Sequence, residues 1–345
     1  MTALEALRPE DLTDAIEECF ARGWTDGLPV VPPIPSLVRR FLDQTDRKPS
    51  EVIWSMRQVR RGCTVEAAAI NAAMAGCRPE YFPVVLAALE AVVDEGWPGN
   101  GGWQSTTGGG PLLIVNGPVR QELGFNSRGN ILGPGFRPNA TVGRAIRLII
   151  MNAYGIRPHD LDQAAHGMPG KYSLCIAENE EESPWEPLHV ELGHDAAVSV
   201  VSAVHTRSTE HIHNSIAEDI RAVLNDIAAT ASRTGAMTTN RSLARRIVVV
   251  IGLEHARKLA AAGFGKRDVK EYLAEHSEHL AGELRRNGRG GALDPAMADE
   301  ATVRLIASPD DVVVVVAGAG NAGLTTVLQT LGFPPKTPGT AVVAR

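Results

Sequence analysis

Five consecutive valines, residues 312–316, constrain the fold more than any other segment of this chain. A run without polar residues has no face for water, so it suits a strand covered on both faces. The run leads into the glycine-rich segment 318–323, after which we expect a terminal helix. A second apolar segment, 246–251, precedes helices expected over 254–262 and 267–286. This alternation of apolar strands and helices predicts an α/β fold, with a mixed sheet and helices on both faces.

The length of the chain predicts one large domain or two medium ones. Its 345 residues exceed what a single hydrophobic core usually holds. The chain turns polar near 206–214, between a β-branched apolar segment and a long amphipathic helix. We therefore expect an N-terminal α/β domain over 1–208 and a C-terminal α/β domain over 209–345. The prolines of residues 24–33 disfavour helix, which predicts an extended arm docked on the first domain.

Composition excludes several classes of function. The net charge of −6 lacks the basic footprint that nucleic-acid binding needs. No apolar run approaches the length of a membrane span, and the first residues lack the order of a signal peptide. Cys19, Cys63, Cys77 and Cys175 show no paired spacing, so we expect free thiols in a cytoplasmic protein. The apolar arm predicts self-association into a homo-oligomer.

Cys77 lies in a short turn between two apolar helices. Gly76 suits the left-handed conformation that ends a helix, and Pro79 suits the first position of the next one. A positive helix end and the neighbouring Arg78 both favour the thiolate, which makes Cys77 a candidate nucleophile. The alternative is a buried, inert cysteine, the commoner fate of free thiols.

An acidic run supplies two further catalytic candidates. Glu178 and Glu180 follow a strand expected over 172–177, so they can reach a pocket at its end as general bases or ligands. The alternative is a solvated run, which we favour for Glu181 and Glu182.

Glycine-rich loops predict a pocket for a small polar or anionic molecule. We expect it to gather the loops 24–33, 97–110, 125–139 and 167–180. Asn139 also suits the N-cap of a helix over 140–154. The residues that we expect to bind the substrate are Thr106, Thr107, Asn139, Arg144, Lys171, Asn179 and Asn321.

Three histidines form a candidate metal site. His211 and His213 are spaced i, i+2, which places them on one face of a strand, and His205 or Glu210 could complete the ligand set. The alternative is a polar loop whose histidines are solvated or locally hydrogen-bonded.

The segment 318–323 matches the G-x-G-x-x-G fingerprint of dinucleotide-binding loops. That fingerprint requires an acidic residue about 20 positions later, and no acidic residue follows Asp311. We therefore expect no NAD or FAD, and either no cofactor or a divalent metal. A phosphate or carboxylate at the following helix N-terminus remains an alternative to a simple tight turn.

Several segments between residues 23 and 193 resemble the UGSC-type (seleno)protein family and its bacterial relatives. They are GWTDGLPVVPP (23–33), AINAAMAGCRPEYFP (69–83), NATVGRA (139–145), GMPGKY (167–172), ENE (178–180) and WEPL (185–188). The resemblance implies an α/β, enzyme-like protein and supports Cys77 as a site candidate. Some relatives carry a UGSC segment in a further domain. This chain has no Cys-Gly-Ser-Cys, so that redox role would require a second subunit.

The leading functional hypothesis is an enzyme of hydrolase or lyase type acting on a small polar or anionic molecule. One alternative is a metalloenzyme with histidine ligands. The other is a non-catalytic scaffold subunit that works with a thiol or selenol redox partner.

Overall fold

One mixed sheet organises the molecule. The computed structural model describes residues 12–96, 101–236, 245–330 and 337–344. The sheet order is β4-β3-β5-β10-β6-β9, and β11 also pairs with β5. The strands are β3 (Gly110–Asn116), β4 (Cys175–Ala177), β5 (Val200–His213), β6 (Ile247–Ile251), β9 (Val312–Val316), β10 (Leu324–Thr330) and β11 (Gly339–Val342). The pairs β3/β4 and β6/β9 are parallel and the other pairs are antiparallel. The predicted α/β class with a mixed sheet is confirmed.

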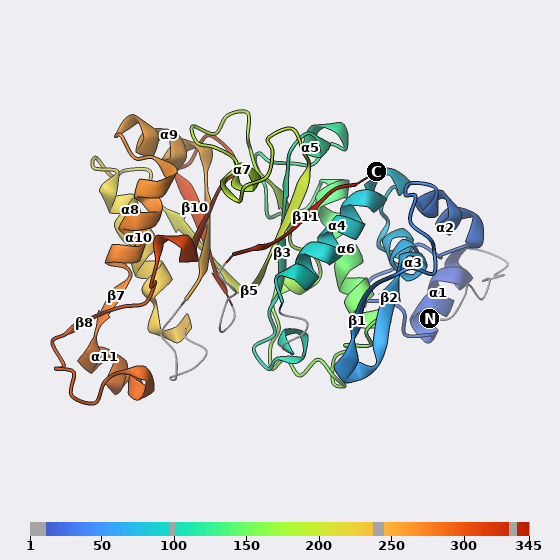
Figure 1. The fold of residues 1–345 in the computed structure, drawn as a ribbon, viewed down its shortest axis with the longest axis horizontal. Coiled ribbons are helices and arrows are strands. Elements are labelled where there is room, and N and C mark those ends of the chain that lie inside the picture. The colour runs from blue at the N-terminus through green and yellow to red at the C-terminus, as the bar shows by residue number, and fades with distance from the viewer. Residues whose placement is uncertain (1–11, 97–100, 237–244, 331–336, 345) are drawn as a thin grey trace.

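The long strand β5 joins two halves of this sheet. Its residues 200–206 pair with β3, whereas 206–213 pair with β10 and 200–203 pair with β11. The sheet is curled, so that its two halves face each other (Figure 1). The polar segment in which we expected a domain boundary is therefore strand, and residue 208 lies inside β5.

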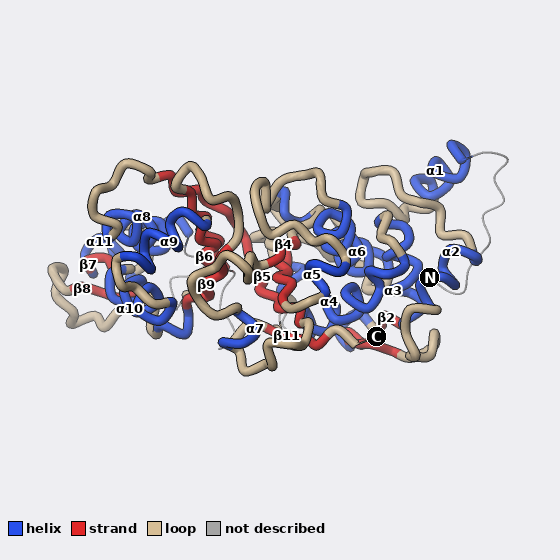
Figure 2. The backbone as a smooth tube through the Cα atoms, turned by 90° about the horizontal axis from the view of Figure 1, so that it is seen from above, coloured by secondary structure: helices blue, strands red, loops and turns tan. Residues whose placement is uncertain are grey.

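Long helices cover the outer face of each half. The half built on β3 and β5 packs against α3 (Val65–Ala75), α4 (Phe82–Asp94) and α6 (Arg137–Asn152). The half built on β6 and β9 packs against α8 (Arg221–Ser232), α9 (Leu253–Ala261) and α10 (Lys266–His276). Figure 2 shows these two helical layers at opposite ends of an elongated molecule, with the sheet between them.

Shorter elements surround this frame. They are α1 (Leu12–Ala21), α2 (Pro35–Leu42), α5 (Val119–Glu122), α7 (Leu188–Glu191), α11 (Ala281–Arg286) and two small antiparallel sheets of two strands each, β1 (Val52–Met56) with β2 (Arg61–Thr64) and β7 (Glu278–Leu280) with β8 (Thr302–Arg304). Within the described ranges, no helix has the length and apolar character needed to span a bilayer.

The inner face of the curled sheet has its own apolar cluster. Leu112 and Ile114 of β3 and Val248 of β6 belong to it, and Leu188 of α7 packs there too. At one end, the two edges of the sheet meet, because the main-chain N–H of Asn179 after β4 donates to the carbonyl of Val316 on β9 (2.8 Å). The two halves are therefore joined both along β5 and at their edges.

Three expected elements differ in the structure. The predicted terminal helix after residue 323 is wrong, because that segment is β10, whose Val327 and Leu328 bury opposite faces. The helix expected over 267–286 is divided, because β7 pairs with the distant β8. Asn139 is the third residue of α6 rather than its N-cap, since the helix already begins at Arg137 with Pro138 in its first turn.

Candidate functional site

A cavity of about 470 Å³ lies on the inner face of the sheet, at the carboxyl ends of β6 and β9. This volume falls within the range of small-molecule sites, and the ends of parallel strands are where α/β folds commonly bind ligands. It is lined by Asn130, Ile131, Leu132, Gly133, His211, Val250, Gly252, Ala317, Gly318, Ala319, Asn321, Ala322, Leu324 and Thr326.

The floor of this cavity is a row of side chains across three strands. Register places His211 of β5 beside Thr326 of β10, and Thr326 beside Val250 of β6. The Nδ1 atom of His211 lies 2.8 Å from the Thr326 hydroxyl, a hydrogen-bond distance. Thr326 is buried and His211 is exposed, so the pair places a fixed hydroxyl beneath an accessible imidazole.

Two glycine-containing loops form the walls. The main-chain N–H of Gly318 donates to the carbonyl of Ser127 (3.0 Å), which joins the loop after β9 to the loop before α6. Gly252 precedes α9, and a Cβ there would lie 2.2 Å from the Leu324 carbonyl oxygen, so only glycine fits. The N-terminus of α9 therefore opens at the cavity, where its N–H groups favour negative charge.

The chemistry that this cavity can support is proton transfer to a polar ligand. None of its lining residues is an Asp, Glu, Lys or Arg, and His211 is the one histidine among them. The amides of Asn130 and Asn321 can accept and donate hydrogen bonds. The predicted residues Asn321 and His211 are thus brought together, although we had assigned them to different sites.

Glu178, a predicted catalytic residue, forms hydrogen bonds that link several segments of the fold. It is fully buried and accepts hydrogen bonds from the Asn116 side chain (2.7 Å) and the main-chain N–H groups of Leu188 (2.7 Å) and Val316 (3.4 Å). Burial raises the pKa of Glu178 above its ordinary value. Since each of these partners belongs to a different segment, Glu178 joins the strand edges to α7.

The acidic residues after Glu178 are also engaged. Glu180 accepts from the Asn116 side chain (2.8 Å) and from Gly117 N–H (2.8 Å), and it pairs with Arg120 at 2.8 Å. Arg120 also pairs with Glu181 (2.8 Å), and this contact lowers the pKa of the Glu181 carboxyl. The run that we considered solvated is thus partly a buried ion-pair network. Neither Glu178 nor Glu180 lines the 470 Å³ cavity.

The structure supports the alternative for Cys77, a buried cysteine, rather than a thiolate. Gly76 adopts a left-handed φ of 86° and ends α3, as predicted. Cys77 itself is buried, however, and burial raises the pKa of its thiol to about 12 despite nearby Arg137 and Arg144. A helix end therefore does not offset the loss of water at this position, and the basis for a nucleophilic Cys77 is removed.

Arg144 and Asn139 hold chain segments in place rather than facing a pocket. The Arg144 guanidinium makes two hydrogen bonds to Asp26 (2.9 and 2.8 Å) and one to the Pro29 carbonyl (2.9 Å). It therefore docks the predicted arm on α6. Asn139 accepts from Asn126 N–H (2.8 Å) and donates to the Asn126 carbonyl (3.0 Å), which fixes the loop before α6.

Asn179 is buried at the junction of the two sheet edges, and its side-chain amide contacts Glu182 at 3.5 Å. Thr107 shares a hydrogen bond with Ser105 (2.8 Å), and the Thr106 carbonyl accepts from Ala165 N–H (2.9 Å). These residues therefore stabilise loops, and none of them lines the 470 Å³ cavity.

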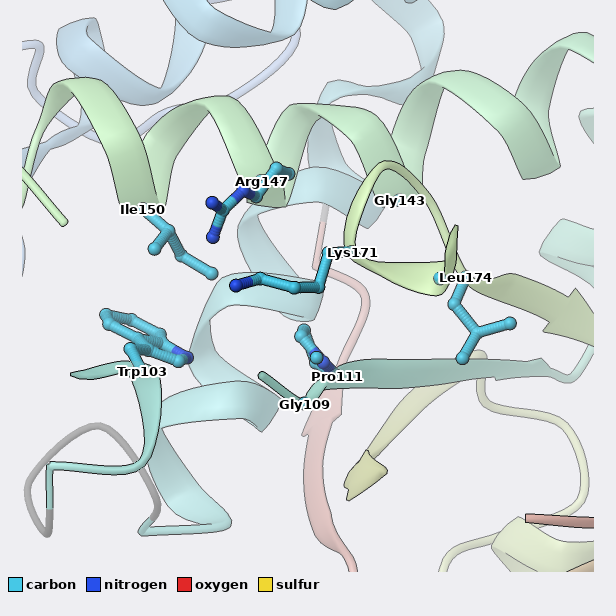
Figure 3. Close-up of a pocket in the computed structure, with 10 residues that line it drawn as sticks. Trp103, Gly109, Pro111, Gly143, Arg147, Ile150, Lys171 and Leu174 are labelled. Carbon is cyan, nitrogen blue, oxygen red and sulfur yellow. The ribbon is translucent and has the colours of Figure 1, made fainter. Parts of the chain in front are cut away.

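Lys171 lies at a second, smaller pocket near the start of β3 (Figure 3). Its ammonium group contacts the buried Asp162 at 2.6 Å, and Arg147 of α6 contacts the same carboxylate oxygen at 2.9 Å. Gly109 and Trp103 of the predicted loop 97–110 also line this pocket. Of the predicted residues, Lys171 alone lines it.

The three histidines of the predicted metal site do not converge. All three lie on β5, but the register shifts between residues 206 and 208, and such an irregularity exchanges the faces of a strand. His205 and His211 are also six positions apart, roughly 20 Å on a strand. Among residues with described placement, no group of three or more His, Cys, Asp and Glu is arranged to hold a metal ion.

Sequence reasoning missed Thr326, Arg147 and Trp103 as pocket residues. Thr326 follows the glycine segment in a run of β-branched residues, a strand signal that the loop fingerprint obscured. No signal in the sequence marks Arg147, which lies one helical turn after Arg144.

Comparisons with protein-family models, curated proteins and solved structures found no match to this chain.

Proposed function

We propose that this chain is an enzyme of hydrolase or lyase type that acts on a small polar molecule bound in the 470 Å³ cavity. The observation that carries the proposal is the hydrogen-bonded pair of His211 and Thr326 on the floor of that cavity. A histidine oriented by a second group beside a ligand-sized space is the usual arrangement of a general acid or base.

His211 would transfer the proton. Thr326 engages Nδ1, so Nε2 is the ring nitrogen that remains for the substrate. A neutral imidazole has one donor and one acceptor nitrogen, and the Thr326 hydroxyl can serve either tautomer because it both donates and accepts. The pair can therefore support removal of a proton in one step and its return in the next.

The rest of the cavity would orient the substrate. Asn130 and Asn321 supply amides from opposite loops, and the N-terminus of α9 opens beside Gly252. Oriented N–H groups stabilise negative charge that develops on an oxygen during acyl transfer or elimination. The absence of a charged side chain among the lining residues favours a neutral polar substrate, or one whose single anionic group faces α9.

The test is turnover of a panel of small amides, esters and 2-hydroxy acids, followed by proton NMR. We expect His211→Gln to lower kcat at least about 100-fold, the usual contribution of a general acid or base. His213→Gln is the matched control, since His213 lies two residues further along β5 and does not line the cavity. Equal kcat for His211→Gln and the wild type would refute this assignment.

A further inference from the structure

The pocket beside Lys171 is a candidate for a ligand of its own. It lies in the other half of the sheet from His211, where Pro111 of β3 and Ile150 of α6 form part of its wall. We propose that this pocket binds one small carboxylate-type anion, of the size of formate, between Lys171, Arg147 and Trp103. The proposal does not depend on the function assigned to the larger cavity.

The charge around the pocket is unbalanced. Lys171 and Arg147 both contact the same oxygen, Oδ2, of Asp162. Two cations share one carboxylate, so the group carries one excess positive charge when all three are ionised. Their side chains are mostly buried, with 14%, 13% and 2% of their surfaces exposed for Lys171, Arg147 and Asp162. Water therefore compensates this excess poorly, and an anion would compensate it directly.

The indole of Trp103 provides a third donor. Trp103 is buried, and its Nε1 atom has no hydrogen-bond partner within the described structure. Figure 3 shows the indole nitrogen on the side of the ring that faces Lys171. An indole N–H can only donate, and leaving it buried without an acceptor is unfavourable. An anion oxygen between the indole and the two cations would supply that acceptor.

The surroundings limit the ligand to a small head group. Gly143 and Gly170 line the pocket, and a Cβ would lie 2.4 Å from Ser173 Oγ at the first and 2.6 Å from Met168 Cε at the second. Larger residues at these two glycines would therefore collide with neighbouring side chains. The cavity volume of about 10 Å³ is close to one water-sized position, so one oxygen of a carboxylate fits there, with the rest of a formate ion toward the pocket opening, whereas a phosphate does not fit.

His205 adds no competing positive charge. A Cβ on Gly109 would lie 2.9 Å from His205 Nε2, so the imidazole lies directly behind the pocket wall. Burial and the neighbouring Lys171 lower the pKa of His205 to about 3, so the ring stays neutral near pH 7. The cations available to an anion are therefore Lys171 and Arg147.

The test uses the full ¹⁵N-labelled chain and follows the indole N–H signals. Trp103→Phe identifies the Trp103 signal by its loss. Sodium formate is titrated against sodium gluconate at constant ionic strength, so that only the size of the anion changes. We expect a saturable shift of the Trp103 signal with formate. A shift that fails to saturate, or none, overturns the proposal, and sodium phosphate should produce no saturable shift.

Two substitutions should move the formate affinity in opposite directions. Lys171→Met should weaken binding at least tenfold, because one cation is lost. Asp162→Asn should tighten binding, because both cations are released from their shared carboxylate. Lys270→Met is the matched control, since Lys270 is another buried lysine that shares a carboxylate, Glu191, with Lys266.

The Lys171→Met result alone decides the proposal if Asp162→Asn does not fold. An unchanged formate affinity in Lys171→Met, or an equal loss in Lys270→Met, would show that the two cations serve only to hold Asp162. The readout is binding rather than turnover, so its failure leaves the role of His211 untouched.

Discussion

The two halves of the curled sheet have similar architecture, but the residues that line their cavities differ in charge. Each half has long helices on its outer face and a cavity among its loops. The pocket of the β3 half is small and lined by two cations that share Asp162. The cavity of the β6 half is large and lined by one histidine and neutral polar groups. The first arrangement suits holding a small anion, whereas the second leaves room for a substrate beside a proton carrier.

The largest expected effect tests whether these halves are one cooperative unit. Glu178 accepts hydrogen bonds from β3, β9 and the start of α7, and it is fully buried. Glu178→Ala leaves those donors unsatisfied, so we expect a loss of about 3 kcal/mol in the free energy of unfolding. Urea denaturation followed by circular dichroism measures it.

Glu181→Ala is the control for this experiment. Glu181 belongs to the same acidic run but its side chain is 39% exposed, so its loss should cost less than about 1 kcal/mol. If Glu178→Ala also unfolds in two separate transitions, the two halves are held together mainly at their edges. Equal small losses for both variants would contradict the role assigned to Glu178.

The second prediction concerns pH and only the β3 half. The pKa of His205 is lowered from 6.5 to about 3 in the folded chain, so the unfolded chain binds the proton first as pH falls. The contribution of His205 to stability is therefore fully present above about pH 6.5 and falls by about 2 kcal/mol over the two pH units below that value. His205→Gln should reduce this slope, as measured by urea unfolding at several pH values, and burial of His189 and His255, which also lowers their pKa values, accounts for part of the slope that remains.

His213→Gln serves as the comparison for this pH series, because His213 is exposed on the same strand. Its stability profile should match that of the wild type. A His205→Gln profile as steep as that of the wild type would show that other groups cause the loss at acid pH.

The smallest expected effects compare two adjacent threonines of the β6 half. Thr325 contacts Nδ1 of the buried His255 (2.8 Å), whose Nε2 donates to the Asn214 carbonyl (2.9 Å). Thr325→Val should cost about 2 kcal/mol, because Nδ1 is left buried without a donor. Thr326→Val should cost about 0.5 kcal/mol, because the exposed His211 can turn to water. Equal losses in thermal unfolding would contradict this difference between the two faces of β10.

Elements with strong local signals could be predicted from the sequence. The valine run is β9, and Gly76 ends α3 in the left-handed conformation that its position in the turn suggested. β10 was mistaken for a helix, because a glycine fingerprint outweighed the β-branched residues that follow it. The division of the helix expected over 267–286 depends on pairing with the distant β8, which no local pattern reveals.

The site was harder to predict because its partners are distant in sequence. Arg144 has the charge of an anion ligand, yet its guanidinium binds Asp26, which lies 118 positions away in sequence. Arg137 and Arg144, rather than the predicted Arg78, are the cations that act on Cys77, and burial outweighs them. His205 and His211 share a strand, and only the register irregularity between them separates their faces. The roles of these residues therefore depend on burial, which can outweigh nearby charge, and on contacts with residues that are distant in sequence.

The pairing of β5 has a consequence for the order in which the chain can fold. One edge of β5 pairs with β3, which precedes it, but among the described residues the opposite edge pairs only with β10 and β11 near the end of the sequence. During synthesis, β5 therefore leaves the ribosome with an open edge that stays unpaired until the last strands appear. Such an edge can recruit another chain and requires slow, non-local closure. We expect this protein to depend on chaperones more than its ordinary composition suggests.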